Sequence, residues 1–186
     1  IYDERGIDLA LLKQLKEVEG ASLEKYVEHH HDAVYTPASA YPAGRNHVWS
    51  VPCQAAFPSA TQNELNEADA DVLLNNGCIC ISEGANMPST PEAVEKFLKA
   101  GICYGPGKAA NAGGVATSQL EMAQNASMQQ WTFEEVDAKL QGIMLGIYTR
   151  ASETAAEFGH PTNLVLGANI AGFRKVADAM IDQGVV

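Results

Sequence analysis

Two stretches of the sequence indicate the fold: ISEGANMPST, at residues 81–90, and ICYGPGKAANAGGVATSQLEM, at residues 102–122. Each segment is a short apolar run that ends in glycine, asparagine and small residues, and helix-start residues follow it. In a parallel α/β sheet, ligands bind beyond the carboxyl ends of the strands, where glycine permits close approach and helix N-termini offer free N–H groups. We therefore predict a ligand-binding cleft at the ends of two neighbouring strands.

The surrounding segments alternate between strand and helix patterns. CICIS (residues 78–82) and ICYG (residues 102–105) predict buried strands, and VWSVPCQAAFP (residues 48–58) predicts a strand pair or one kinked strand. Helices are predicted between them, because Asn66 and Thr90 are good N-caps and a glycine closes each segment. The fold class is therefore α/β: a partial Rossmann-like parallel sheet with helices on both faces and right-handed crossovers.

Helical patterns occupy the two ends of the chain. An amphipathic helix is predicted at residues 8–19, with Ile7, Leu11, Leu15 and Val18 on one face, and a shorter helix from Ser22 to about residue 28. After Gly114 the pattern indicates a C-terminal all-helical segment. There a capping box of Thr132 with Glu135 starts a long helix that ends at Gly159. The inward face of that helix and of the last one is predicted to hold Val136, Leu140, Ile143, Ile147 and Ala151, and then Ile170, Phe173, Ala177 and Met180.

Composition excludes two classes of partner. No apolar stretch approaches the roughly 18 residues that span a bilayer, so we expect no membrane insertion. The formal net charge of −11 opposes binding to phosphate backbones, so we expect no nucleic-acid partner. The four cysteines include no CxxC pair and are predicted to be reduced core thiols, which indicates a reducing, cytoplasmic compartment. His29, His30 and His31 have no matching acidic or cysteine ligands, so no metal site is predicted.

Several motifs in order carry a resemblance to a known family. FPSATQNEL, EGANMP, KAANAGGVATSQLEM and PTNLVLGANIAGFRKVADAM resemble the carboxyl-terminal half of the small bacterial and fungal type of glutamate dehydrogenase. The likeness covers the whole chain and is dense from Val51 onward. The family's glycine fingerprint and its catalytic lysines and aspartate match nothing in this sequence. The resemblance therefore implies a portion of a longer enzyme, with no catalytic residue in this chain and no turnover by this chain alone.

The resemblance also implies a reaction. The parent enzyme would reductively aminate 2-oxoglutarate with ammonia and NAD(P)H to give L-glutamate, and would run in reverse. It implies NADP as the cofactor, with NAD possible, an absent N-terminal substrate domain as a partner, and a homo-oligomer, a hexamer, in the parent. Residues 1–114 would be the cofactor-binding α/β part, without its first strand. Residues 115–186 would pack on that part and close the active-site cleft.

Particular residues receive roles from the resemblance. Ser118 would bind the distal carboxylate of the substrate, with Val115 lining the pocket and Asn111 beside it. Asn86 would face the nicotinamide half of the cofactor, and the other cofactor-binding residues would be Gly84, Ala85, Ala60, Thr61 and Gln62. Gln54 and Ser59 depart from the aspartate and cysteine common in the family at those positions.

The residues alone leave alternatives open. The Ser118 hydroxyl could bond its own helix, and Asn86 could form an Asx turn before Pro88. Glu83 could be a solvent-facing acid or a ribose partner, and Lys108 is interpreted as a surface or phosphate-proximal cation. Leucine and phenylalanine dehydrogenases share the NAGG motif but lack a serine matching Ser118. A further possibility is a folded binding or packing module without catalytic activity.

Overall fold

The computed structural model describes residues 1–184, and the chain divides into two compact units, Ile1–His47 and Val48–Val186. The predicted boundary at residue 114 falls inside the second unit. The functional roles predicted for residues 1–114 and for residues 115–186 stay predictions.

The first unit is built from short helices around a small core. α1 (Leu9–Lys13) continues into a π-helical turn, η1 (Gln14–Val18), and η2 (Leu23–Lys25) continues into α2 (Tyr26–His29). Asp8 and Ser22 cap these segments, at the two predicted helix starts, and the core consists of Leu15, Tyr26 and Ala33. The prediction that Val18 faces inward is wrong, because the π turn widens the repeat and leaves that side chain 70% exposed.

The histidine run of this unit makes local polar contacts. His30 stacks on Tyr26, with ring centroids 4.7 Å apart. Its two ring nitrogens lie 3.6 Å from carboxylate oxygens of Asp3 and Asp8. In the part of the chain that the structure describes, no three metal-ligating side chains converge, and no helix has the length and apolar character needed to cross a bilayer.

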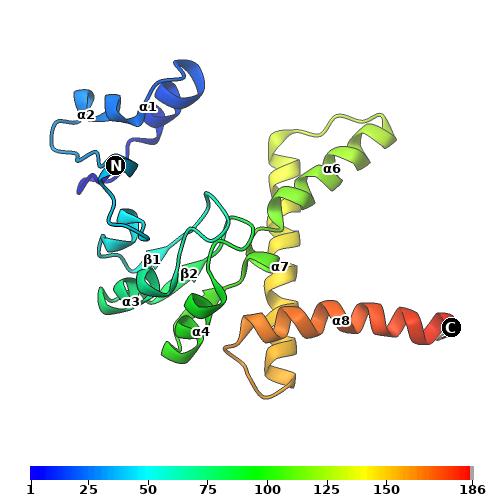
Figure 1. The fold of residues 1–186 in the computed structure, drawn as a ribbon. Coiled ribbons are helices and arrows are strands. Elements are labelled where there is room, and N and C mark those ends of the chain that lie inside the picture. Colours follow the sequence, from blue (N-terminus) through cyan, green and yellow to red (C-terminus); the bar gives the residue numbers. More distant parts are fainter. Residues whose placement is uncertain (185–186) are drawn as a thin grey trace. The chain divides into compact units, whose positions relative to one another are not determined.

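The second unit contains the parallel sheet. Its strands are β1 (Ala55–Ala56), β2 (Cys80–Ser82) and β3 (Cys103–Gly105), in the order β1-β2-β3 and parallel throughout. α3 (Glu67–Asn75) and α4 (Pro91–Ala100) connect successive strands and lie on the same side of the sheet (Figure 1). This arrangement confirms the predicted α/β class. The predicted strand at residues 48–58 is mostly wrong, since η4 (His47–Ser50) and Pro52 leave only two residues to pair.

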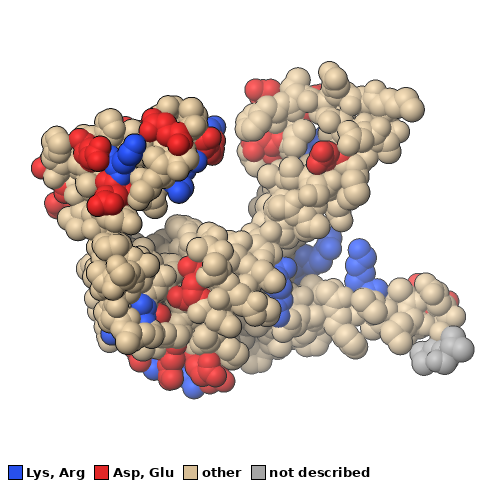
Figure 2. Space-filling view, turned by 45° about the horizontal axis from the view of Figure 1, so that its top comes forward, with Lys and Arg blue, Asp and Glu red and all other residues tan. Residues whose placement is uncertain are grey.

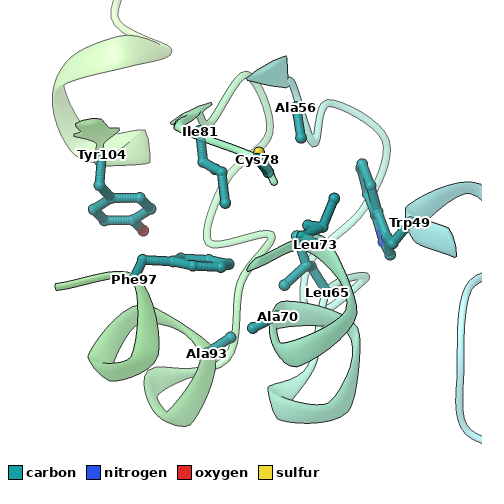
Figure 3. Packing of buried hydrophobic residues seen from close by; sticks show 10 residues of the cluster. All are labelled: Trp49, Ala56, Leu65, Ala70, Leu73, Cys78, Ile81, Ala93, Phe97 and Tyr104. Atoms are coloured by element: carbon teal, nitrogen blue, oxygen red, sulfur yellow. The ribbon is translucent and has the colours of Figure 1, made fainter. Parts of the chain in front are cut away.

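One hydrophobic layer holds α3 and α4 on the sheet. Ile81 and Tyr104 are register partners on β2 and β3, so their side chains leave the sheet on one face. Phe97 of α4 is fully buried and packs against Tyr104, with ring centroids 5.7 Å apart (Figure 3). Trp49 closes the β1 end, and its indole nitrogen donates to the carbonyl of Glu64 at 3.1 Å.

The predicted helix boundaries of this unit are confirmed by their caps. Asn66 and Asp69 form a reciprocal capping box at the start of α3. Thr90 caps α4, Pro91 occupies its first position, and Gly101 ends it in the left-handed conformation at φ 70°. A second capping box, Thr132 with Glu135, starts α7.

Four helices follow the sheet: α5 (Gly107–Ala110), α6 (Gly113–Ser127), α7 (Phe133–Glu157) and α8 (Leu164–Gln183), of which α8 crosses α7 (Figure 1). The start of α8 and the middle of α7 line a cavity of about 220 Å³ against Ser82 and Gly105. Helices therefore also lie against the sheet face opposite α3 and α4. The predicted inward face of α7 is confirmed, with Ala151 buried and its companions half-buried.

The predicted inward face of α8 is partly wrong. Phe173 is 73% exposed and Met180 is 50% exposed, whereas Ile170 and Ala177 are half-buried. The burial of α8 is concentrated in its first turns, where Val165 packs against the core and Gly167 is buried. Apolar residues do recur at helical spacing along α8. Within residues 1–184, however, no element covers the apolar side chains of its distal half.

The cysteines are free, but the prediction of four core thiols is also partly wrong. Cys78 is buried, Cys53 and Cys80 are half-buried, and Cys103 is exposed. Burial raises the pKa of the Cys80 thiol, and the neighbouring Cys103 thiol adds to this effect. The Cys80 thiol is therefore protonated at neutral pH, which makes it a poor nucleophile.

Candidate functional site

Three segments meet at the carboxyl edge of the sheet: the loop at residues 57–63 after β1, the loop at residues 83–88 after β2, and residues 105–111, which follow β3 and contain α5. The first two are joined by main-chain hydrogen bonds. The amides of Gly84 and Ala85 both donate to the carbonyl of Pro58, at 2.9 and 3.1 Å, and the amide of Asn63 donates to the carbonyl of Met87 at 3.0 Å. The predicted cofactor residues 60–62 and 84–86 therefore lie on adjacent loops.

The contact between these two loops requires glycine at position 84. A Cβ atom there would overlap the side-chain oxygen of Ser59. That Ser59 hydroxyl is itself fixed, because it donates to the carbonyl of Phe57 at 3.0 Å. Ser59, one of the two departures from the family pattern, thus stands directly at the loop contact.

The side chain of Glu64 closes the first loop. Its Oε1 atom accepts from the amides of Ala60 at 2.8 Å and Thr61 at 3.3 Å. The three-residue spacing of Thr61 and Glu64 suits a capping box, but α3 starts only at Glu67, so here the spacing stabilises a loop. The loop geometry is demanding, since Asn63 has a left-handed φ of 57°.

Glu83 is not a solvent-facing acid, which was one of the two alternatives that the sequence left open; its role as a ribose partner stays a prediction. Its side chain is buried, with 4% of the residue exposed, and its Oε2 atom accepts from the amide of Gly107 at 2.7 Å. Its Oε1 atom has no hydrogen-bond partner among the described residues. Nothing in the sequence distinguishes this glutamate from a surface one, because its partner is a backbone amide 24 residues away.

A second hydrogen bond lies beside the bond between Glu83 and Gly107. The Asn111 side-chain amide donates to the carbonyl of Ala85 at 3.0 Å. We call the pair of bonds, Glu83 to Gly107 and Asn111 to Ala85, the loop brace. The brace ties residues 83–88 to residues 105–111, so it links a predicted cofactor loop to a predicted substrate residue.

Tyr104 stands next to this brace in the core. Burial raises its pKa far above the ordinary value, and the neighbouring Glu83 carboxylate raises the pKa further. The phenol is therefore neutral at any physiological pH. The phenol gives the buried Glu83 a polar neighbour, beside the buried Ser89 hydroxyl.

The remaining predicted substrate residues lie on α6. Ser118 is exposed and its hydroxyl donates to the carbonyl of Gly114 at 3.3 Å, and Val115 is 61% exposed. The hydroxyl thus makes the bond to its own helix that was the alternative interpretation of Ser118. Ala112, at the N-cap, supplies no side-chain hydrogen bond, so the first amides of α6 have no side-chain acceptor at that position.

The exposed groups of this edge suit an uncharged or anionic ligand. Gly84 and Asn86 are exposed on one loop, and Ala60, Thr61 and Gln62 are exposed on its neighbour. Asn86 offers an amide that both donates and accepts, and glycine admits close approach of a ring or a sugar. These features are typical of parallel α/β domains that bind ligands at the carboxyl edge of the sheet.

A match to a protein-family model identifies the family to which this α/β domain belongs. Residues 1–184 match the family model described as glutamate/leucine/phenylalanine/valine dehydrogenase. The chain belongs to this family of amino-acid dehydrogenases.

Curated relatives and solved structures agree with that membership. The NADP-specific glutamate dehydrogenase of Helicobacter pylori strain J99 is 63% identical over 185 residues, covering 100% of this chain and 41% of the relative. That of Escherichia coli K12 is 58% identical over 138 residues, covering 74% of this chain and 31% of the relative. The crystal structure of Plasmodium falciparum glutamate dehydrogenase superposes with a TM-score of 0.89 at 44% identity, covering 100% of this chain and 39% of that one.

A more distant structure shares the fold alone. A hetero-hexameric glutamate dehydrogenase from Thermus thermophilus has a TM-score of 0.79 at 21% identity, covering 100% of this chain and 40% of that one. The chain spans about two fifths of the length of the curated relatives that it matches over its whole length.

Proposed function

We propose that this chain is the part of an NADP-dependent glutamate dehydrogenase that orients the cofactor and completes the substrate pocket. The whole enzyme would convert 2-oxoglutarate, ammonia, NADPH and a proton into L-glutamate, NADP⁺ and water, and the reverse. The observation that carries the proposal is the joining of two loops and the α5 segment at one edge of the sheet, through Pro58, Glu83 and Asn111. NADP is preferred to NAD because the similar curated proteins named above are NADP-specific.

Gly84, Ala85 and Asn86 would hold the nicotinamide side of the cofactor, and Ala60, Thr61 and Gln62 would pass its ribose and phosphates. The fit is supported by the exposed Asn86 amide and by the bare backbone at Gly84, where the neighbouring Ser59 leaves no room for a side chain. When bound, the reduced nicotinamide supplies the hydride. This chain would hold the cofactor in the correct position. Two reacting groups held in the correct geometry react several powers of ten faster than the same groups that meet freely in solution.

Ser118, Val115 and Asn111 would form this chain's share of the substrate pocket. The Ser118 hydroxyl can rotate from the Gly114 carbonyl toward a carboxylate, because its present bond of 3.3 Å is long for a hydroxyl donor. Asn111 would act through the loop brace, since its amide already holds Ala85. The catalytic acid–base groups, the substrate domain and the contacts of a homo-hexamer would belong to the rest of the polypeptide and to its partner subunits.

Ser118→Ala in the full-length polypeptide tests the substrate assignment. Loss of one charge-assisted hydrogen bond predicts an increase of roughly tenfold or more in the KM for 2-oxoglutarate, with the KM for NADPH unchanged. Thr117→Ala is the matched control, because the Thr117 hydroxyl makes the same type of bond, to Gly113 at 2.9 Å. Equal effects of both substitutions would mean that Ser118 serves only its helix.

Calorimetric titration of the same polypeptide with NADPH and with NADH tests the cofactor assignment. The proposal expects binding heat with NADPH and weaker binding of NADH. Asn86→Ala is expected to weaken NADPH while it leaves 2-oxoglutarate binding intact. Absence of heat at millimolar NADPH would favour a packing module without a cofactor. Preferential use of an apolar 2-oxo acid would favour a leucine or phenylalanine dehydrogenase.

A further inference from the structure

A second hollow lies where α5, α7 and α8 meet. It has a volume of about 300 Å³. Three cationic side chains line it, one from each helix: Lys108 of α5, Arg150 of α7 and Lys175 of α8. The rest of the lining is small or apolar: Ala109, Ile147, Ala151, Ala168, Ala171 and Gly172. We call this hollow the basic pocket.

Among the described residues, no carboxylate forms an ion pair with a cation of the basic pocket. No aspartate or glutamate is among its lining residues, and within residues 1–184 neither Arg150 nor Lys175 forms an ion pair. Lys108 is held in place by a neutral group, because its ammonium donates to Asn169 Oδ1 at 2.6 Å. A hydrogen bond to an amide fixes the position of the charge without neutralising it.

Such a gathering is unexpected in this chain, which has 12 basic and 23 acidic residues. Figure 2 shows blue lysine and arginine side chains gathered beside α8, where little red is seen. Arg150 and Lys175 also line the next hollow along α8, where Arg174 is paired with Glu157 and Asp178 is an acidic lining residue. Three like charges around one hollow repel each other, and an anion placed between them removes that repulsion.

We propose that the basic pocket binds a phosphate group. The guanidinium of Arg150 presents the planar fork that matches phosphate oxygens, and the two ammonium groups add point charges around it. The other lining residues carry no polar side chain, so recognition in this pocket rests on the three cations. Because Arg150, Lys175 and Lys108 are exposed, binding is weak, in the millimolar range, and falls as salt rises. This site is independent of the proposed dehydrogenase function.

The test is a ³¹P NMR titration of the full-length polypeptide with inorganic phosphate at fixed ionic strength. Wild type is expected to bind saturably, and Arg150→Gln with Lys175→Gln is expected to weaken binding at least about tenfold. Lys16→Gln with Lys139→Gln is the matched control, since it removes the same charge outside the pocket and is expected to leave the affinity unchanged. Circular dichroism of each variant confirms that the fold is retained.

Three results would overturn the proposal: no saturable phosphate binding by wild type, equal loss in the pocket and control variants, or unchanged binding in the pocket variant. The first would mean that the rest of the polypeptide covers or neutralises the pocket, and the second that phosphate responds only to overall charge. Ser118→Ala is expected to leave phosphate binding unchanged. The phosphate result therefore stands whether or not the dehydrogenase assignment holds.

Discussion

Two helices of the second unit, α4 and α8, have apolar faces of similar period but different surroundings. α4 buries Phe97 and Ala93 completely against the sheet and α3. α8 buries Gly167 against α7, while Phe173, Val176 and Met180 of its distal half stay exposed. A periodic pattern thus identifies which face of a helix is apolar, but it does not identify the element that covers that face.

The largest difference is expected when a phenylalanine is replaced by alanine in α4 and, separately, in α8. Phe97→Ala removes a fully buried ring and is expected to lower the free energy of unfolding by about 3–5 kcal/mol. Phe173→Ala removes a ring that is 73% exposed and is expected to change it by about 0.5 kcal/mol or less. Urea denaturation of the chain measures both. Similar losses for the two variants would show that α8 is covered as α4 is.

The next effect concerns the crossing of α7 and α8. A Cβ atom at Gly167 would overlap the carbonyl oxygen of Ala151 and crowd Ala155, so Gly167→Ala forces the helices apart. The expected loss is about 1–3 kcal/mol. Gly172→Ala, on the same helix with open space around its Cβ, is expected to stabilise the chain by about 0.5–1 kcal/mol. Thermal unfolding of the two variants should therefore shift in opposite directions, and shifts of the same sign would contradict the close crossing.

The loop brace predicts coupling between two side chains at the edge of the sheet. Glu83→Ala and Asn111→Ala each remove one bond between the same two loops. Their effects on unfolding are expected to be non-additive, with an interaction energy of about 0.5–2 kcal/mol in a double-mutant cycle. Glu83→Gln keeps an acceptor for the Gly107 amide and is expected to restore much of the loss. Strict additivity would mean that the two loops are held independently.

The smallest effect is a pH dependence at the surface of the α7–α8 pair. The Arg174 guanidinium bonds the Glu157 carboxylate at 2.7 and 3.0 Å and lowers the pKa of that carboxyl. A lowered folded-state pKa gives stability that is present above the ordinary value and is lost as pH falls through the lowered one. In an NMR titration, Arg174→Gln is expected to return the Glu157 pKa toward its ordinary value. An unchanged pKa would mean that the ion pair does not form in solution.

Local signals in the sequence predicted most of the fold. The caps at Asn66, Thr90 and Thr132 act over three or four residues, so the sequence alone was enough to place these helix starts. β1 was harder to predict, because Pro52 and the η4 turn shorten a strand whose composition suits a longer one.

The site was only partly predictable, for a different reason. The motifs identified the loops, and the structure places the first two side by side and ties the third to the second. The contribution of Glu83 depends on the Gly107 amide, which becomes its neighbour only after folding, so no spacing in the sequence reveals it. Glu64 differs, because it bonds amides only three and four residues away, at a spacing that the sequence displays. The exposure of Phe173 could not be predicted either, since it depends on what packs against α8.

The most direct test of the central claim is hydrogen–deuterium exchange of the full-length polypeptide with and without NADPH and 2-oxoglutarate. We expect the ligands together to slow exchange in residues 57–63, 83–88 and 105–118. Protection confined to other segments, with these three exchanging as in the free protein, would contradict a shared site at the carboxyl edge of the sheet.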